Sequence, residues 1–232
     1  MRLITYDRGG ARRLGAWVGE AVVDLPDAVG HPAFPSTMEA LVARHGGTTM
    51  DAARAAVEHP DVARYSVSNP RLLMPIAPAS VRTVPDQAVR PPNQRYVTPS
   101  GNGLEVACVL GSGGGDLSIQ EAADAIFGYS LVTAVTLGPT IVTADEIDPS
   151  NPRFFATIDG HPFEEATFDT ARLAAVIART SIDEELHPGD IFIFHTAPGH
   201  PTEIRRRRVR SDALFDLDAP RAGVLGKLAG SR

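Results

Sequence analysis

Short apolar runs separated by glycine and proline turns recur along the chain, and this pattern predicts a protein made mainly of β-strands. Taken with the helices described next, it predicts an α+β, mainly β, fold with many short strands. The runs most typical of strands are residues 3–6, 13–18, 21–25, 81–88, 106–110, 129–137, 140–144, 153–159 and 191–194.

Apolar residues at helical spacing predict four helices between these strands. Two lie early in the chain, at residues 38–45 and 50–58. A third begins after Ser118 and ends at Gly128, because serine caps a first turn and glycine often ends a last one. The fourth runs through residues 170–177.

Composition narrows the classes of protein to which the chain could belong. Its 232 residues, 43% of them hydrophobic, are enough for a sizeable core. The net charge of −6 and the pI near 5.6 argue against nucleic-acid and membrane-surface partners. The start of the sequence lacks the apolar stretch of a signal peptide, and no run reaches membrane-spanning length. With a single cysteine, these features favour a cytoplasmic location.

Several residues with reactive side chains are expected to have ordinary structural roles. Cys108 lies inside an apolar strand and is predicted to be a buried core residue. His31, His45 and His59 have no metal-ligand spacing and are predicted to be exposed to solvent. His161 follows a turn directly and receives the same prediction.

Beyond these patterns, the sequence resembles the fumarylacetoacetate hydrolase family. The resemblance rests on Glu105, on Val109-Leu110-Gly111, on Gly128-Tyr129, and on Gly138-Pro139 followed by IVTADEI at residues 141–147. It continues through Asn151-Pro152, Ile158-Asp159-Gly160, residues 186–190 and Thr196-Ala197-Pro198-Gly199.

The resemblance covers most of the chain and implies its architecture. Residues 1–72 are expected to form a small N-terminal β-rich module, and residues 73–232 a domain of rolled mixed β-sheets. The runs at residues 213–217 and 224–228 resemble the strands that close the family's barrel. Relatives are commonly homodimers, so a homodimer is expected here as well.

The family's metal ligands are mostly absent from the sequence. In the family, two glutamates and an aspartate hold a divalent metal. Aligned on the motifs above, only Glu105 remains, while Gly103 and Ala134 occupy the other two ligand positions. Because Mg²⁺ and Ca²⁺ need several oxygen ligands, we expect no metal and no other cofactor.

Two further family features are missing. No histidine lies between His59 and His161, so the family's general base has no equivalent, and Gln87 is nearest to its position. Glutamine can orient a substrate but cannot accept a proton. The family's substrate loop is also absent, since only Leu137 separates Thr136 from Gly138. The metal-dependent hydrolase reaction is therefore disfavoured.

Histidines appear instead near a preserved threonine. Thr196 matches the threonine that contacts the substrate carboxylate in relatives, and it lies in the loop His195–His200. His195 and His200 could perform acid–base chemistry, or His195 could pack against the loop while His200 is exposed. Tyr129 and Gln87 are further candidates for substrate binding.

Glu105 is the remaining candidate for catalysis. If Val106 faces the core, Glu105 looks into the family's cavity, where an apolar surround would raise its pKa. A salt bridge to an arginine would lower that pKa instead. We expect Glu105, His195 and Thr196 to face one pocket.

The sequence leaves two classes of function open. One is a metal-independent enzyme that acts on a small oxo-acid or β-dicarbonyl compound, by tautomerisation, cyclisation, decarboxylation or C–C cleavage. The other is a catalytically inactive binding or scaffold protein. The arginine run at residues 205–208 is most typical of a solvated edge strand, with an anionic ligand as the alternative.

Overall fold

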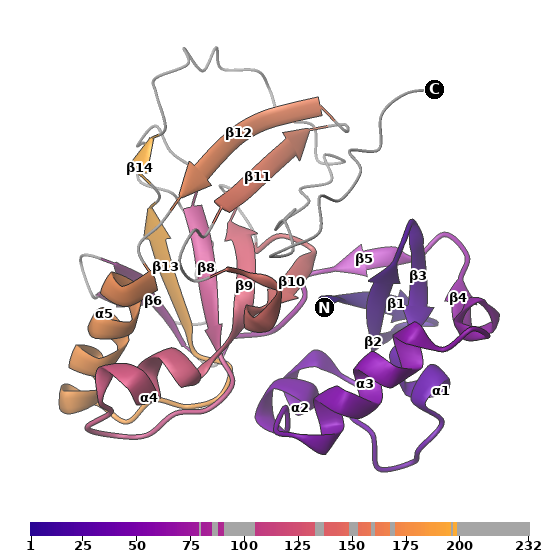
Figure 1. The fold of residues 1–232 in the computed structure, drawn as a ribbon, viewed down its shortest axis with the longest axis horizontal. Helices are drawn as coiled ribbons and strands as arrows, with labels where there is room; N and C mark the ends of the chain where they lie inside the picture. The colour runs from indigo at the N-terminus through magenta and orange to yellow at the C-terminus, as the bar shows by residue number, and fades with distance from the viewer. Residues whose placement is uncertain are drawn as a thin grey trace.

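The computed structural model describes residues 1–78, 80–84, 88–90, 105–132, 137–148, 153–158, 161–167, 170–195 and 197–198. Within them, strands form two sheets, and the larger sheet joins the N-terminal part of the chain to its centre (Figure 1). Its strand order is β4-β3-β2-β1-β10-β9-β8-β13-β6-β7, with β5 also paired to β1. This mainly β architecture confirms the predicted fold class.

The strands of the larger sheet match most of the predicted runs. Their bounds are β1 Arg2–Arg8, β2 Ala11–Val18, β3 Ala21–Asp24, β4 Ser66–Val67, β5 Arg71–Leu73, β6 Val81–Val84, β7 Ala88–Arg90, β8 Glu105–Leu110, β9 Ile126–Val132, β10 Thr140–Thr143 and β13 Ile191–His195.

The N-terminal strands form the predicted meander. β1 and β2 turn at Gly9 and Gly10, whose φ angles of 64° and 87° favour glycine over residues with a side chain. β1 also pairs with β10, Leu3 opposite Ile141, so the N-terminal strands belong to the same sheet as the rest. The predicted boundary at residue 72 falls inside β5.

Helices near the N-terminus cover one end of this meander (Figure 1). They are α1 Leu25–Val29, α2 Met38–Ala43, α3 Thr48–Glu58 and the 3-10 turn η1 Val62–Tyr65. α2 and α3 confirm the two helices predicted at residues 38–45 and 50–58.

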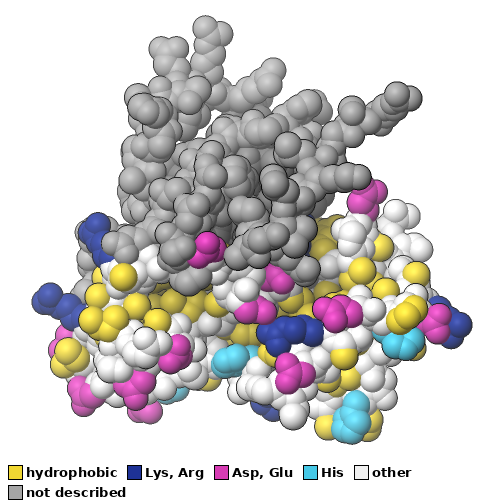
Figure 2. Space-filling model, viewed as in Figure 1, with side chains coloured by type: hydrophobic (Ala, Val, Ile, Leu, Met, Phe, Trp, Pro, Cys, Tyr) yellow, Lys and Arg dark blue, Asp and Glu magenta, His cyan; other side chains and the backbone are white. Residues whose placement is uncertain are grey.

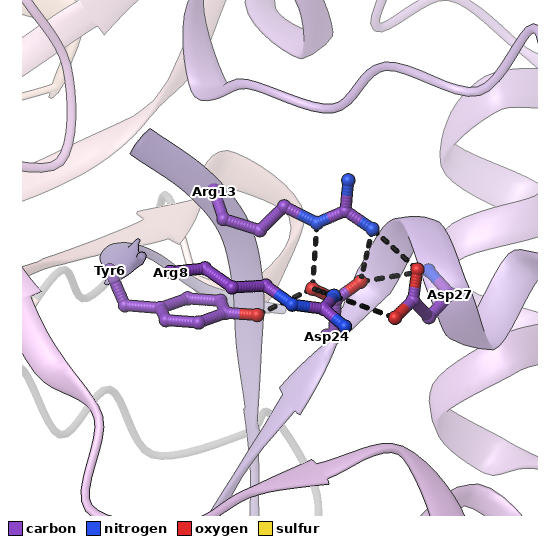
Figure 3. A network of polar contacts seen from close by, with 5 residues as sticks. All are labelled: Tyr6, Arg8, Arg13, Asp24 and Asp27. Carbon is purple, nitrogen blue, oxygen red and sulfur yellow. Dashed lines mark hydrogen bonds and ion pairs between the residues drawn. The ribbon is translucent and has the colours of Figure 1, made fainter. Parts of the chain in front are cut away.

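A charged network ties β1, β2 and α1 together (Figure 3). Asp24 is 2% exposed and accepts hydrogen bonds from the Tyr6 hydroxyl and from Nε and Nη2 of Arg13, at 2.7 and 3.0 Å for the guanidinium. Arg8 lies 2.9 Å from the same carboxylate. Asp24 also caps α1, accepting from the backbone N–H of Asp27 at 2.8 Å.

The central strands are buried on both faces. On one face, Ala107, Val109 and Ile193 pack into a core with side chains from α1, α2 and α3. On the other, Cys108 and Phe192 pack with side chains from α4 (Ile119–Asp124) and α5 (Thr170–Asp183). Cys108 is 0% exposed, as predicted for a core residue, and burial raises the pKa of its thiol.

The helix predicted after Ser118 is present but shorter than expected. Ser118 accepts from the backbone N–H of Glu121 at 3.2 Å, and the Glu121 side chain accepts from the N–H of Ser118 at 2.8 Å. This capping box fixes the start of α4. The predicted end at Gly128 is wrong, because Gly128 lies inside β9, where a side chain would overlap the backbone of Val142 on β10.

The smaller sheet contains β11 Arg153–Ile158, β12 His161–Thr167 and β14 Ala197–Pro198, in the order β11-β12-β14. It stands beyond the end of β13 (Figure 1). The loop predicted at residues 195–200 is therefore partly wrong: His195 ends β13 and the next described residues form β14. α5 extends six residues past the predicted end, from Ile177 to Asp183. Among the helices that the structure describes, none is both long and apolar enough to cross a membrane.

Candidate active site

Two of the predicted catalytic residues lie opposite each other on neighbouring strands. β8 and β13 are antiparallel, and Glu105 is the register partner of His195. The two residues are far apart in the sequence, so only the sheet brings them together. Directly opposed positions of an antiparallel pair share one face of the sheet, with Cβ atoms about 4.5–5.5 Å apart.

The same row of the sheet continues into β9. Glu105 is paired on its other side with Val132, and Val132 forms a bridge with Leu137. Val132 and Leu137 are 6% and 2% exposed. Glu105 and His195 thus occupy adjacent register positions in the same row as two buried apolar residues.

The alternation of each strand fixes which face these positions share. Ala107 and Ile193 follow the parity of Glu105 and His195, and both belong to the core beneath the N-terminal helices. Val106 and Phe194 belong to the opposite core, beneath α4 and α5. Val106 therefore faces a core, which is the condition under which Glu105 was expected to look into the cavity. The pKa of Glu105 stays a prediction.

Tyr129 lies away from the pair. Its register partner is Cys108, so it belongs to the face covered by α4 and α5, and it is 4% exposed. Burial is the main cause that raises the pKa of its phenol, and the phenol therefore stays protonated at neutral pH. Glu105 and His195 are not register partners of Tyr129.

The remaining predicted site residues, Gln87, Thr196 and His200, lie outside the described residues. So do Gly103, Ala134 and the arginine run at residues 205–208. The prediction that Thr196 shares a pocket with Glu105 and His195 therefore stays a prediction.

A cavity of about 390 Å³ lies elsewhere, between the N-terminal helices and the central sheet. It is lined by residues of α3, α4, β9 and η2 (Ala144–Glu146). Ile126, at its wall, pairs with Leu110, at the opposite end of β8 from Glu105. At about 3.3 Å per residue the two ends of β8 are about 17 Å apart, so this is a second location.

Sequence reasoning missed this cavity because it placed His45 in solvent. His31 and His59 are exposed as predicted, but His45 is partly buried. Its ring meets Phe127 edge-on, with centroids 5.5 Å apart, and lies over Gly111, which has no side chain to occupy that space. Nothing in the sequence next to His45 indicates these distant neighbours.

No family model matches the sequence, and a search of curated proteins finds no match. Solved structures do resemble the chain. One is the fumarylacetoacetate hydrolase of Exiguobacterium antarcticum, at 17% identity and a TM-score of 0.56, covering 84% of this chain and 86% of that one. Another is the maleylpyruvate hydrolase of Sphingobium sp. SYK-6, solved with manganese(II) and pyruvate, at 22% identity and a TM-score of 0.59, covering 85% and 90%.

A third is a probable 2-hydroxyhepta-2,4-diene-1,7-dioate isomerase of Mycobacterium abscessus, at 18% identity and a TM-score of 0.54, covering 86% of each chain. At these identities the similarity shows the fold. The chain has the fold of fumarylacetoacetate hydrolase and its relatives, as its sequence motifs predicted.

Proposed function

We propose that this chain, built on the fumarylacetoacetate hydrolase fold, is an enzyme that moves a proton on a small oxo-acid or β-dicarbonyl compound without the family's metal. His195 is its general base, and Glu105 positions the imidazole. The observation that carries the proposal is their register pairing across β8 and β13. The names of the structural neighbours, two hydrolases and an isomerase, support the substrate class.

The pairing suits proton transfer because a carboxylate next to an imidazole makes the imidazole a better base. A carboxylate beside an imidazole favours the imidazolium form and holds the ring in one orientation. The register neighbour Val132 and its bridge partner Leu137 are buried and apolar. His195 is therefore the proposed base, and Glu105 the residue that orients it.

The proposed step is the simplest reaction open to such a pair. Neutral His195 takes a proton from the carbon between two carbonyl groups, and the electrons of the broken C–H bond are shared by both carbonyl oxygens. The imidazolium then returns the proton to an oxygen, which completes a tautomerisation. Cyclisation, decarboxylation and C–C cleavage can begin from the same enolate.

The residues at this position do not fit the family's metal. Beside Glu105, the described neighbours are His195 and the apolar Val132, which together offer one carboxylate and one imidazole. A hard divalent cation needs several oxygen ligands. A β-dicarbonyl compound depends less on a metal, because its second carbonyl already shares the charge of the enolate. We therefore derive no step through a metal.

Deuterium exchange tests the proposal directly. Protein dialysed against EDTA should accelerate the exchange of the methylene protons of acetylacetone and acetoacetate in D₂O, followed by NMR, in proportion to protein concentration. His195→Gln should reduce this acceleration by about a hundredfold or more, the usual contribution of a general base. Glu105→Gln should reduce it less, since Glu105 acts through His195.

Matched controls are available on the surface. His187 and Glu185 are exposed beyond the end of α5, and His187→Gln and Glu185→Gln should leave exchange unchanged. Exchange that survives in His195→Gln would refute the proposed base. Saturable binding of both probes with no exchange above background would favour the alternative, a binding protein without catalytic activity.

A further inference from the structure

The cavity between the N-terminal helices and the central sheet has a chemistry of its own. One wall is apolar and comes from Met50, Ile126 and Phe127. The polar lining of the cavity consists of His45, Arg54, Thr143 and three aspartates, Asp51, Asp124 and Asp145, and the small residues Gly47, Ala123 and Ala144 complete it. Figure 2 shows acidic, basic and histidine side chains close together near the middle of the view.

The charge of the cavity is negative. Its single guanidinium, Arg54, lies 3.2 Å from Asp51 and 2.9 Å from Asp145, so its positive charge is already matched. Among the described lining residues, three carboxylates and one guanidinium leave two negative charges in excess. Asp124 contacts the neutral Gln120 at 3.0 Å.

Asp145 remains ionised in this setting. Burial raises the pKa of its carboxyl. Hydrogen bonds from Thr143 and Arg54 and the positive charge of the Met1 amino group outweigh burial, so the pKa is lowered overall. At neutral pH the cavity therefore keeps its negative charge.

His45 adds a hydrogen-bond acceptor. Its Nδ1 lies 2.8 Å from the carbonyl oxygen of Val42, and because a carbonyl can only accept, Nδ1 must carry the hydrogen. In the neutral ring this leaves Nε2 as an acceptor. Acceptors and negative charge thus predominate over donors.

We propose that this cavity binds a small organic cation, an ammonium compound with an apolar body. The carboxylates receive the N–H groups, and Met50, Ile126 and Phe127 cover the apolar part. The volume of about 390 Å³ lies within the range of roughly 300–1,000 Å³ typical of small-molecule sites. This site is independent of the proposed active site, which lies at the other end of β8.

Three probes with one body and different charge test the proposal by calorimetry. Tryptamine carries an ammonium, tryptophol a neutral hydroxyl at the same place, and indolepropionate a carboxylate. Tryptamine should bind about tenfold more tightly than tryptophol, and indolepropionate should bind most weakly. Added salt should lower the affinity for tryptamine and leave the affinity for tryptophol nearly unchanged.

Substitutions separate the cavity from the general negative charge of the protein. Asp124→Asn should weaken tryptamine about three- to fivefold, the effect of one partly solvated carboxylate. Asp61→Asn removes an equal charge from an exposed position outside the cavity and should change nothing. Arg54→Gln should raise the affinity for tryptamine, because it removes the guanidinium that pairs with Asp51 and Asp145.

Four results would contradict a cation-binding cavity. Equal affinity for tryptamine and tryptophol, tighter binding of indolepropionate, or the same loss in Asp61→Asn as in Asp124→Asn would overturn the proposal. So would the absence of saturable tryptamine binding. Glu105→Gln should bind tryptamine as tightly as the wild type. Tryptamine binding is therefore expected even if the protein does not accelerate deuterium exchange.

Discussion

Replacing the carboxylate of Asp24 by an amide tests whether the charged network of Figure 3 stabilises the N-terminal strands. Asp24→Asn keeps the size of the side chain and keeps an oxygen that can cap α1 and accept from Tyr6. The change removes the negative charge that faces Arg8 and Arg13. It also turns an amide donor toward a guanidinium, which has donors only.

The structure sets the expected loss of stability. Removing one partner of a fully buried ion pair costs about 3–5 kcal/mol. Here the Asp24 side chain is 4% exposed, but Arg13 is 24% exposed, and water can partly solvate the guanidinium that remains. Arg13 also keeps its contact with Asp27. We therefore expect a loss of about 2–3 kcal/mol, below the fully buried case.

The loss should depend on pH. Burial raises the pKa of Asp24, but hydrogen bonds from Arg13 and Tyr6 outweigh burial and lower it overall. A lowered folded-state pKa means that the contribution to stability is complete above the ordinary aspartate pKa, about 3.9. The contribution disappears as the pH falls through the folded-state pKa, so the difference between wild type and Asp24→Asn should shrink in acid.

Urea unfolding at several pH values measures both effects. Trp17, the only tryptophan in the sequence, lies on the neighbouring strand β2 and reports on this region by fluorescence. Asp27→Asn is the matched control, because Asp27 contacts the same two arginines but is 42% exposed, and should cost about 1 kcal/mol or less. Equal losses in the two variants, or a loss for Asp24→Asn that does not change with pH, would refute the reasoning.

Arg82→Met should lower the free energy of unfolding by about 2–4 kcal/mol in the same assay, because Arg82 is 4% exposed and its loss removes the guanidinium 3.2 Å from the buried Asp190; Arg179→Met, on the exposed side of α5, is its control. Gly113→Ala should prevent normal folding, measured by circular dichroism, since its methyl group would overlap the Leu186 carbonyl, whereas Gly46→Ala meets no neighbour and should fold normally. Elemental analysis of the purified protein should find no stoichiometric divalent metal, and one Mg, Mn or Ca per chain lost in Glu105→Ala would contradict this. Fumarylpyruvate, acylpyruvates and oxaloacetate should be hydrolysed no faster than background with added Mg²⁺ or Mn²⁺, and robust metal-stimulated hydrolysis would show that the sequence alignment of the ligand strands is wrong.

Local features of the chain could be predicted from the sequence because their causes are local. The turn at Gly9-Gly10 and the helix cap at Ser118 depend on residues a few positions apart, and both are present in the structure. The burial of Cys108 followed from the apolar run around it. The motifs at Glu105 and at residues 138–147 predicted the fold through resemblance, which the solved structures support.

Contacts between distant residues were decided only by the tertiary structure. The pairing of Glu105 with His195 depends on the register of β8 against β13, and a slip of one residue would move each to the other face of the sheet. Gly128 lies in β9 and does not end α4. Its lack of a side chain allows the backbone of β10 to approach closely, and β10 comes later in the chain. His45 is partly buried because its ring packs against Phe127 and over Gly111, which has no side chain. A periodic pattern shows that a face is apolar, but only the packed sheet determines what that face meets.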